Sequence, residues 1–298
     1  MENRKFRYMS ASNRAFYIFN AIFWVVVMFI VIYPLYLVVI SSISDPDAVA
    51  NGRTFLWIAD FTLEGYELAF SDDSLVRGYG NSLFYLVLGT LVNLLLTIPA
   101  AYALSKKRLL GRNFFTLFLI ITMYFSGGTI PTYIVVKGIG LLDTPWAIIF
   151  ASGLATSNLI IARTFFQSSI PQELEEAAEI DGASTIQTFL RIVLPLSKAM
   201  IGVITLYYAV GRWNEYTTAL YYQPTASDMW PLQLVLRRIL IQTKQLAEYD
   251  PELAEYYAEL ANQMKYAVVV IASAPLLIVY PFIQKYFDKG VMMGSLKG

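Results

Sequence analysis

Carboxylates are concentrated in one short stretch, and four of them are the side chains best placed to take part in recognition chemistry: Glu173, Glu175, Glu176 and Asp181. Neither His nor Cys occurs in the 298 residues. Their absence excludes histidine general bases, Ser-His triads, His-ligated metals, thiolate metal sites and disulfides. We therefore expect no catalytic residue and no metal site, and we interpret the carboxylates as part of a surface that binds another protein.

The stretch that carries these carboxylates is predicted to fold as a short helix. Pro171 suits the first turn, where its missing N–H costs nothing, and the glutamates complement the positive end of the helix dipole. Gly182 can adopt a positive φ and turn the chain where the helix ends. A second short helix is predicted from Ser184 to Val193, before Pro195 leads into the next apolar segment.

One face of the first helix is expected to consist largely of small residues. Spacing of three and four residues places Leu174, Ala177, Ala178 and Asp181 on a common face. The alternative is an amphipathic helix that lies on the membrane, but such helices favour Lys and Arg against anionic lipid. The acidic residues therefore favour docking to a soluble partner.

The elements around this stretch are predicted to cross a membrane. Hydrophobic residues make up 57% of the chain and charged residues 15%, against roughly a quarter charged in a soluble chain. Runs of roughly 20 apolar residues are long enough to span a bilayer as helices. The expected fold class is an all-α membrane protein with six transmembrane helices, at residues 16–40, 81–104, 114–133, 146–166, 200–220 and 266–283.

Two of the six segments have special features. The first is too long for the apolar region of a signal peptide and lacks a small-residue cleavage site, so we interpret it as a retained span. The third is interrupted by Ser126, Gly127 and Gly128, and Pro131 follows. We expect this helix to bend or end there, because glycine and proline loosen a helix.

The orientation of the spans is predicted from Lys and Arg, which favour the cytoplasmic side. With the N-terminus inside, the inner segments carry twice as many of these residues as the outer segments. The chain is therefore expected in the bacterial cell membrane, multi-pass, with both termini in the cytoplasm. The predicted organisation is an N-terminal segment at 1–15, a six-span domain at 16–289 with an inner loop at 167–199 and an outer loop at 221–265, and a tail at 290–298.

Two further features concern the partners of the chain. Asp250, Pro251 and Glu252 are typical of a helix start in the outer loop. The net charge is formally zero, so the composition shows no footprint of nucleic-acid binding.

The inner loop resembles a known family. Glu176-Ala177-Ala178, then Gly182, then Ile192-Val193-Leu194-Pro195 is similar, at every position, to the EAA motif of binding-protein-dependent ABC importer permeases. In that motif EAA is followed by three residues, Gly, nine residues and I-x-L-P. The resemblance implies a type I importer fold in which the short helix is a coupling helix for a cytoplasmic ATPase. The ATPase-coupling residues that it implies are Glu176, Ala177, Ala178, Asp181 and Gly182.

Two other stretches resemble the carbohydrate branch of these importers. The ending from Gly290 through Gly294 to Lys297 and Gly298 is similar to the tail of the second maltose-permease subunit, which reaches the ATPase dimer interface. Lys297 and Gly298 are therefore auxiliary coupling candidates. The four residues 213–216, Trp-Asn-Glu-Tyr, resemble the W-N-x-[YF] of the same branch. From the first span to the end, the chain resembles permeases of complex-oligosaccharide and polygalacturonan importers.

The resemblance implies a division of labour between subunits. The chain contains no G-x-x-x-x-G-K-[ST] phosphate loop, so it cannot hydrolyse ATP by itself. Two cytoplasmic ATPase subunits would bind ATP and Mg²⁺, and no cofactor is expected in this chain. A second, homologous permease subunit would complete the pathway, and an extracellular binding protein would deliver the carbohydrate.

Residues along the transport path are predicted from polar or aromatic character within the spans. Arg212 and Glu215 are three residues apart and can pair on one helix face, and ionisable groups in lipid usually face the interior of a bundle. Bonding between neighbouring helices explains the polar candidates as well, and an interfacial belt explains the aromatic ones. The candidates are Tyr124, Asn158, Arg212, Trp213, Asn214, Glu215 and Tyr216.

Other classes of protein remain open at this stage. A secondary transporter often shows inverted repeats and mid-bilayer carboxylates, and the sequence shows neither. A membrane-embedded enzyme would have a narrow catalytic repertoire without His or Cys. Among ABC permeases, one for a peptide or an amino acid is the alternative substrate class.

Overall fold

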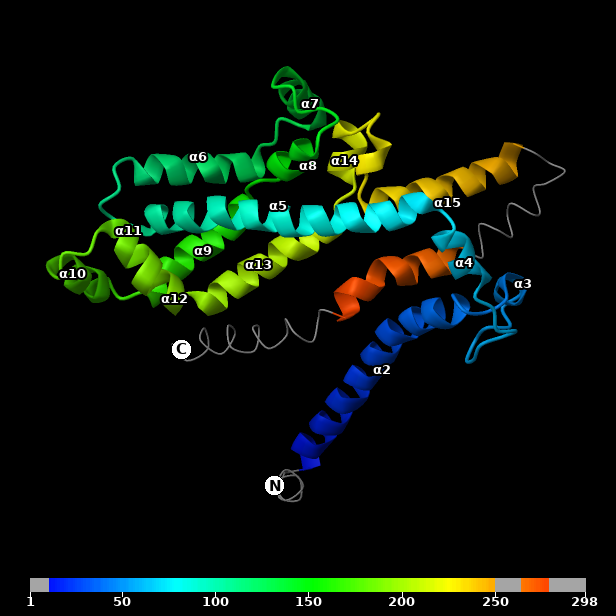
Figure 1. Ribbon diagram of the computed structural model, residues 1–298. Coiled ribbons are helices and arrows are strands. Elements are labelled where there is room, and N and C mark those ends of the chain that lie inside the picture. Colours follow the sequence, from blue (N-terminus) through cyan, green and yellow to red (C-terminus); the bar gives the residue numbers. More distant parts are fainter. Residues whose placement is uncertain (1–10, 250–263, 279–298) are drawn as a thin grey trace. The chain divides into compact units, whose positions relative to one another are not determined.

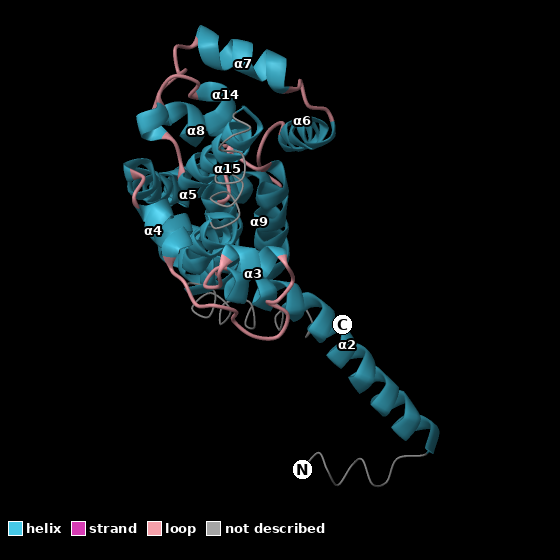
Figure 2. Cartoon of the chain, turned by 90° about the vertical axis from the view of Figure 1, so that its right-hand side faces the viewer, coloured by secondary structure: helices cyan, strands magenta, loops and turns pink. Residues whose placement is uncertain are grey.

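The computed structural model describes residues 11–249 and 264–278. These residues form helices joined by loops (Figure 2), with one isolated antiparallel bridge between Ser44 and Phe61. The chain divides into two compact units, one of residues 1–71 and 240–271, the other of residues 72–239 and 272–298.

The first unit contains the longest exposed apolar helix, α2 (Ala11–Ser41), followed by α3 (Pro46–Ala50) and α4 (Glu64–Phe70). The apolar side chains of α2 are exposed along most of its length, as expected for a span that faces lipid. Hydroxyl groups tie the following loop to this helix. Tyr33 and Tyr36 donate to the carbonyls of Phe55 (3.0 Å) and Leu56 (2.6 Å).

The second unit is built around α5 (Asp73–Ser105), which packs against α9 (Thr156–Ser169) and α13 (Lys198–Trp213) (Figure 1). Small residues lie at these contacts. Ala101 of α5 and Ala162 of α9 are fully buried, and this allows the helices to approach closely. Larger side chains fill the same core, among them Tyr102, Leu159, Phe166 and Ile204.

The third apolar segment is broken where the glycines predicted a break. Helix α6 (Arg112–Tyr124) ends before Ser126, and α7 (Thr129–Gly138) leaves at 117° to it. Gly128 has φ 86, a conformation that L side chains rarely adopt. The prediction of a bend or an early end at this point is confirmed.

The fourth segment was predicted as a continuous helix and is broken, and a second break precedes the fifth segment. The fourth divides into α8 (Pro145–Ala151) and α9, bent by 50°. Ahead of the fifth, α11 (Thr185–Thr188), the π-turn η1 (Phe189–Val193) and α12 (Leu194–Leu196) meet α13 at 82°, and the break lies at Ser197. There the Ser197 hydroxyl donates to the carbonyl of Val193 (2.7 Å), a local bond that competes with a regular helix.

The end of the fifth segment also differs from the prediction. Helix α13 stops at Trp213 instead of Leu220, and α14 (Thr217–Tyr222) follows as a separate helix. Polar side chains explain the interruption. Asn214 donates to the carbonyl of Val210 (2.9 Å), and the Glu215 carboxylate accepts from the N–H of Thr218 (3.0 Å) at the start of α14.

The predicted outer loop contains helices that the sequence analysis did not identify. The short η2 (Ser227–Met229) and the 18-residue α15 (Leu232–Tyr249) occupy its first half. Pro231 precedes α15, and Leu232, Leu234 and Val235 are buried. The predicted helix start at 250–252 lies outside the described residues. The apolar helix Met264–Ile278 overlaps the sixth predicted segment, whose remainder is also outside them.

Candidate functional site

The predicted coupling helix is present as α10 (Gln172–Ile180), and Asp181 is its C-cap. Gly182 follows at φ 81. Its N–H donates to the carbonyl of Glu179 (3.1 Å), and the N–H of Ala183 donates to the carbonyl of Ala178 (2.9 Å). These two bonds form a Schellman motif, which satisfies carbonyls at the end of a helix and requires a left-handed residue after the cap. The predicted turn at Gly182 is therefore confirmed in its backbone geometry.

The exposed face of α10 differs in one respect from the predicted face. Ala177 is exposed, whereas the side chain of Ala178 is only 6% exposed and turns inward. The prediction that Ala178 shares a presented face with Ala177 is wrong, because the turn after Gly182 brings α11 against that side of α10. Glu176 is exposed and accepts from the Gln172 amide (2.6 Å).

Apolar side chains beside the carboxylates were missed in the sequence. Ile180 is 86% exposed, and Ile186 and Leu190 are also exposed on the following elements. Exposed apolar residues bordered by charge mark sites of protein interaction. In the sequence, these three apolar residues could have been noticed because they lie on either side of the turn at Gly182.

The segment after the turn is held by local bonds. Ser184 and Gln187 form a capping box at the start of α11, with distances of 2.8 and 3.3 Å between the paired atoms. The second short helix predicted from Ser184 to Val193 is present, but its second half is the π-turn η1. Short π-helical turns are rare in proteins, and many of those that occur lie at functional sites.

Two ion pairs connect α10 to the loop after α5. Lys106 pairs with Glu175, and Arg108 pairs with Glu179 at 2.9 Å. The space between the end of α5, this loop, the end of α9 and the α10–α11 turn is a cavity of about 1270 Å³. The ion pairs therefore lie at the wall of an open depression on this side of the unit.

A buried arginine lies deep in the same unit. Arg212 of α13 donates to Asn93 Oδ1 (3.0 Å) and to the carbonyls of Ile148 (2.7 Å), Ile149 (2.8 Å) and Ser152 (3.0 Å). The three carbonyls lie at the C-terminal end of α8, where a helix leaves its carbonyls without intrahelical partners. The positive charge also complements the negative end of the α8 dipole.

Other polar groups complete this arrangement around the break between α8 and α9. Asn93 donates to the carbonyls of Ser152 and Gly153, both at 2.7 Å. Tyr208, one turn before Arg212, accepts from the N–H of Ala155 (3.1 Å) at the start of α9. Because lipid offers no alternative partners, these contacts allow a break in the helix at membrane depth.

The remaining path candidates are scattered. The Trp213 indole is buried and donates to the carbonyl of Ala272 (3.0 Å), whereas Asn214 is exposed and bonds within its own chain segment. Glu215 caps α14, and the Tyr216 ring lies 5.9 Å from the Arg237 guanidinium. Tyr124 is exposed at the end of α6, and Asn158 is buried in the first turn of α9. The structure does not gather these seven side chains into one site, and their role in transport stays a prediction.

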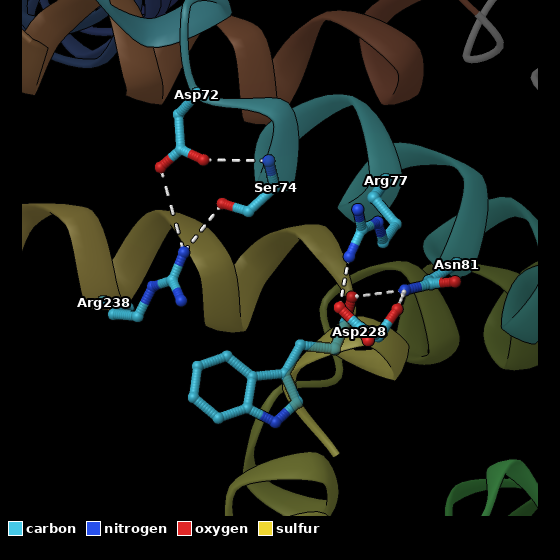
Figure 3. A network of polar contacts seen from close by, with 7 residues as sticks. Asp72, Ser74, Arg77, Asn81, Asp228 and Arg238 are labelled. Carbon is cyan, nitrogen blue, oxygen red and sulfur yellow. Dashed lines mark hydrogen bonds and ion pairs between the residues drawn. The ribbon is translucent and has the colours of Figure 1, made fainter. Parts of the chain in front are cut away.

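The other end of α5 carries a polar network (Figure 3). Arg77 pairs with the Asp228 carboxylate, and the Asn81 amide donates to the carbonyls of Asp228 (2.8 Å) and Trp230 (3.0 Å). Arg238 donates to the Ser74 hydroxyl (2.7 Å) and lies 3.8 Å from the Asp72 carboxylate. The network fastens η2 and the first turns of α15 to the first turns of α5.

Asp143 organises the turn between α7 and α8 in the same region. Its Oδ1 accepts from the N–H groups of Thr225 (3.0 Å) and Ala226 (3.1 Å). Hydrogen bonds from Thr225, its side chain first and its backbone next, together with the bond from the Ala226 N–H, lower the pKa of the Asp143 carboxyl below its usual value. A lowered pKa means that the ionised form is favoured in the folded chain.

This contact predicts an acid-sensitive loop. The contribution of Asp143 to stability is present above the unfolded pKa, which is about 4, and is lost as the pH falls through the lower folded pKa. We expect Asp143→Ala to increase proteolytic cleavage of residues 223–231 modestly at pH 7, because Asp143 is only partly buried. Asp143→Asn retains an acceptor oxygen and should give an intermediate, pH-independent rate. Equal cleavage of the wild type and Asp143→Ala at pH 7 would contradict the assignment.

The auxiliary candidates Lys297 and Gly298 lie outside the described residues. Their expected contact with an ATPase therefore remains a prediction from the resemblance alone.

Comparisons with known proteins agree with this geometry along almost the whole chain. Protein LplC of Bacillus subtilis is 43% identical over 287 residues, covering 96% of this chain and 96% of that protein. The polygalacturonan/rhamnogalacturonan transport system permease protein YtcP of Bacillus subtilis is 40% identical, covering 96% of this chain and 99% of that protein. A chain in the crystal structure of a bacterial ABC transporter involved in the import of the acidic polysaccharide alginate superimposes with a TM-score of 0.84 at 33% identity. The superposition covers 94% of this chain and 99% of the alginate importer chain.

The family model that matches covers most of the second unit. Residues 74–293 match the binding-protein-dependent transport system inner membrane component. The matched region includes α5, the α10 turn, the Arg212 contacts and the network at Asp228. The chain therefore belongs to the family of binding-protein-dependent transport system inner membrane components, the membrane permeases of ABC importers.

Proposed function

We propose that this chain is the permease subunit of an ATP-driven importer that takes up a carbohydrate of the oligosaccharide class. The observation that carries the proposal is the exposed surface of α10 and its turn. There Glu176, Ala177 and Ile180 are exposed beside a Schellman motif that Gly182 makes possible. A soluble ATPase with a matching cleft would bury the apolar residues and pair the carboxylates.

The carbohydrate class is supported by the names of two similar proteins. One relative is a polygalacturonan/rhamnogalacturonan permease, and the similar solved structure belongs to an alginate importer. Both similarities extend over more than nine-tenths of this chain. A related function along the same length is a simpler explanation than a change to peptides or amino acids.

In the proposed mechanism the partner subunits bind ATP, and this chain changes conformation in response. Two ATPase subunits hold ATP and Mg²⁺ on the cytoplasmic side, where both termini and α10 lie. Their closure displaces α10, and the broken spans re-pack between inward-open and outward-open states together with a second permease subunit. An extracellular binding protein supplies the solute at the side that carries Asp228 and α15.

Reconstitution in proteoliposomes tests the proposal. The chain, its paired permease and its ATPase are purified as one complex, and uptake of labelled oligogalacturonides, alginate oligosaccharides, maltodextrins and peptides is measured with the binding protein present. We expect uptake of a saccharide that requires ATP and the ATPase. Uptake driven by a proton or sodium gradient in the absence of the ATPase would overturn the proposal, and uptake of peptides alone would overturn the carbohydrate assignment.

A further inference from the structure

The connection between α10 and α5 is formed by side chains far apart in sequence. Lys106 caps the end of α5, and its ammonium pairs with the carboxylate of Glu175 in the first turn of α10, 69 residues further on. The same ammonium lies 4.2 Å from the centre of the Tyr102 ring. The pair therefore joins the end of a long apolar helix directly to the helix that carries the proposed docking surface.

The Lys106–Glu175 pair is sheltered from water, unlike its neighbour. The side chains of Lys106 and Glu175 are 28% and 17% exposed, whereas those of Arg108 and Glu179 are 75% and 65% exposed. Exposed ion pairs are screened and contribute little. A partly buried pair with a cation–π contact is held more firmly, and loss of one partner leaves a poorly solvated charge.

The chain itself provides only indirect connections between these two helices. Helix α10 continues from α9 through Pro171, and it leads through Gly182 into α11 and then α13. Both routes pass through turns, at Pro171 and at Gly182, that can absorb a displacement of α10. Of the two ion pairs, Lys106–Glu175 is the one that joins α10 to the capping residue of α5, and it is the more direct route by which α10 can pull or push the end of that helix.

The opposite end of α5 is fastened as well. Arg77, Asn81 and Ser74 bond to η2 and to the first turns of α15, as Figure 3 shows. Helix α5 has 33 residues, which corresponds to roughly 50 Å at 1.5 Å per residue. One helix thus connects the α10 side of the unit with the segment at Asp228.

We propose that Lys106 and Glu175 are positioning residues that make α5 move with α10, so that α5 transmits the displacement to the far side of the subunit. This inference rests on the proposed function, because it takes α10 to be the helix that the ATPase moves. It adds a direct connection through side chains to the path along the chain.

Charge exchange tests the connection in the reconstituted complex. Lys106→Glu and Glu175→Lys are each expected to lower uptake per ATP hydrolysed by about tenfold or more, because like charges then face each other. The double exchange should restore part of the lost uptake, since the attraction returns with reversed sign while the contact with the Tyr102 ring is lost. Co-purification with the ATPase is measured for each variant, and uptake is expressed per ATP hydrolysed, so that weaker ATPase binding is separated from lost transmission to α5.

The exposed neighbouring pair is the matched control. Arg108→Glu, Glu179→Arg and their combination should change uptake by about twofold or less. Single variants at Lys106 and Glu175 that transport like the wild type would overturn the proposal, as would a double exchange that restores nothing. A wild-type complex without ATP-dependent uptake would instead overturn the proposed function, so the two failures are distinguishable.

A cross-link provides a second test that does not depend on charge. The chain has no Cys, so Lys106→Cys with Glu175→Cys in cysteine-free partners creates one unique pair. Bridging the pair with a short bis-maleimide reagent should preserve uptake to within about twofold, because the two helices are proposed to move together. Loss of uptake on bridging, at unchanged ATP binding, would show that α5 and α10 separate during the cycle and would overturn the proposal.

Discussion

Replacing Arg212 with Met is expected to destabilise the folded subunit by on the order of 3–5 kcal/mol, because four buried hydrogen bonds from one guanidinium are lost together. The carbonyls of Ile148 and Ile149 would each lose the guanidinium hydrogen bond that the structure gives them. An acceptor left unsatisfied in a buried place costs about 1–3 kcal/mol. The break between α8 and α9 would then rest on the contacts of Asn93 and Tyr208 alone.

The measurement is the thermal unfolding of the purified complex in detergent, followed by tryptophan fluorescence. A loss of this size corresponds to a melting temperature lower by about 10 °C for a chain of this length. Arg212→Lys should be intermediate, since an ammonium cannot reproduce the planar fork that reaches two carbonyls and Asn93 together. A melting temperature of Arg212→Met within about 2 °C of the wild type would contradict this account.

Two glycines of α5 give a matched control for the same site. A Cβ added at Gly89 would lie 2.8 Å from Arg212 Nε, and the guanidinium cannot easily retreat while it keeps its four hydrogen bonds. A Cβ added at Gly80 meets nothing within 4 Å. Gly89→Ala should therefore destabilise the subunit, whereas Gly80→Ala should be neutral or stabilising by about 0.5–1 kcal/mol.

The sequence predicts the parts of the fold that depend on neighbouring residues. The helix start near Pro171, the turn at Gly182 and the second helix start at Ser184 each depend on residues within about four positions. The structure contains all three, with Pro171 as the N-cap of α10 and not in its first turn. The glycine break after α6 belongs to the same class, because Gly127 and Gly128 interrupt the helix without distant partners. These local signals are sufficient to place the α10 turn by residue number.

Features that depend on distant residues were missed for a physical reason. Hydropathy treats Ile148, Ser152 and Asn158 as one span, and the break between them is stable because Arg212 supplies donors from about 60 positions away. The same holds for Lys106 and Glu175, which local periodicity cannot associate. The expected pairing of Arg212 with Glu215 assumed one continuous helix, but the helix ends at Trp213 and the Glu215 carboxylate caps α14.

The turn after α10 carries the second large expected effect. Gly182→Pro should reduce uptake by at least about tenfold, because proline is held near φ −65° and cannot adopt the φ of 81° observed there. Proline also lacks the N–H that bonds the carbonyl of Glu179. The reorientation of α10 against α11 would remove the coupling surface, while the distant spans would still pack and the complex would still assemble.

A graded series separates backbone conformation from side-chain size at this position. Asn tolerates the left-handed region, Ala is strained by about 1–2 kcal/mol, and a β-branched residue is strained further. Uptake should therefore fall in the order Gly, Asn, Ala, Val, Pro, with membrane insertion and complex yield measured for every variant. Full uptake by Gly182→Pro would contradict a role for this turn in coupling.

Ala177 and Ala178 distinguish docking from internal packing, because they are adjacent but Ala177 is exposed and Ala178 is buried. Ala177→Trp adds bulk to the exposed face and should block association with the ATPase while leaving the melting temperature of the isolated subunit unchanged. Ala178→Trp adds bulk where the side chain is only 6% exposed, and overpacking of such a site costs about 1–3 kcal/mol. If both variants lowered the melting temperature and neither affected ATPase binding, α10 would be a packing element and its exposed face would not be the coupling surface.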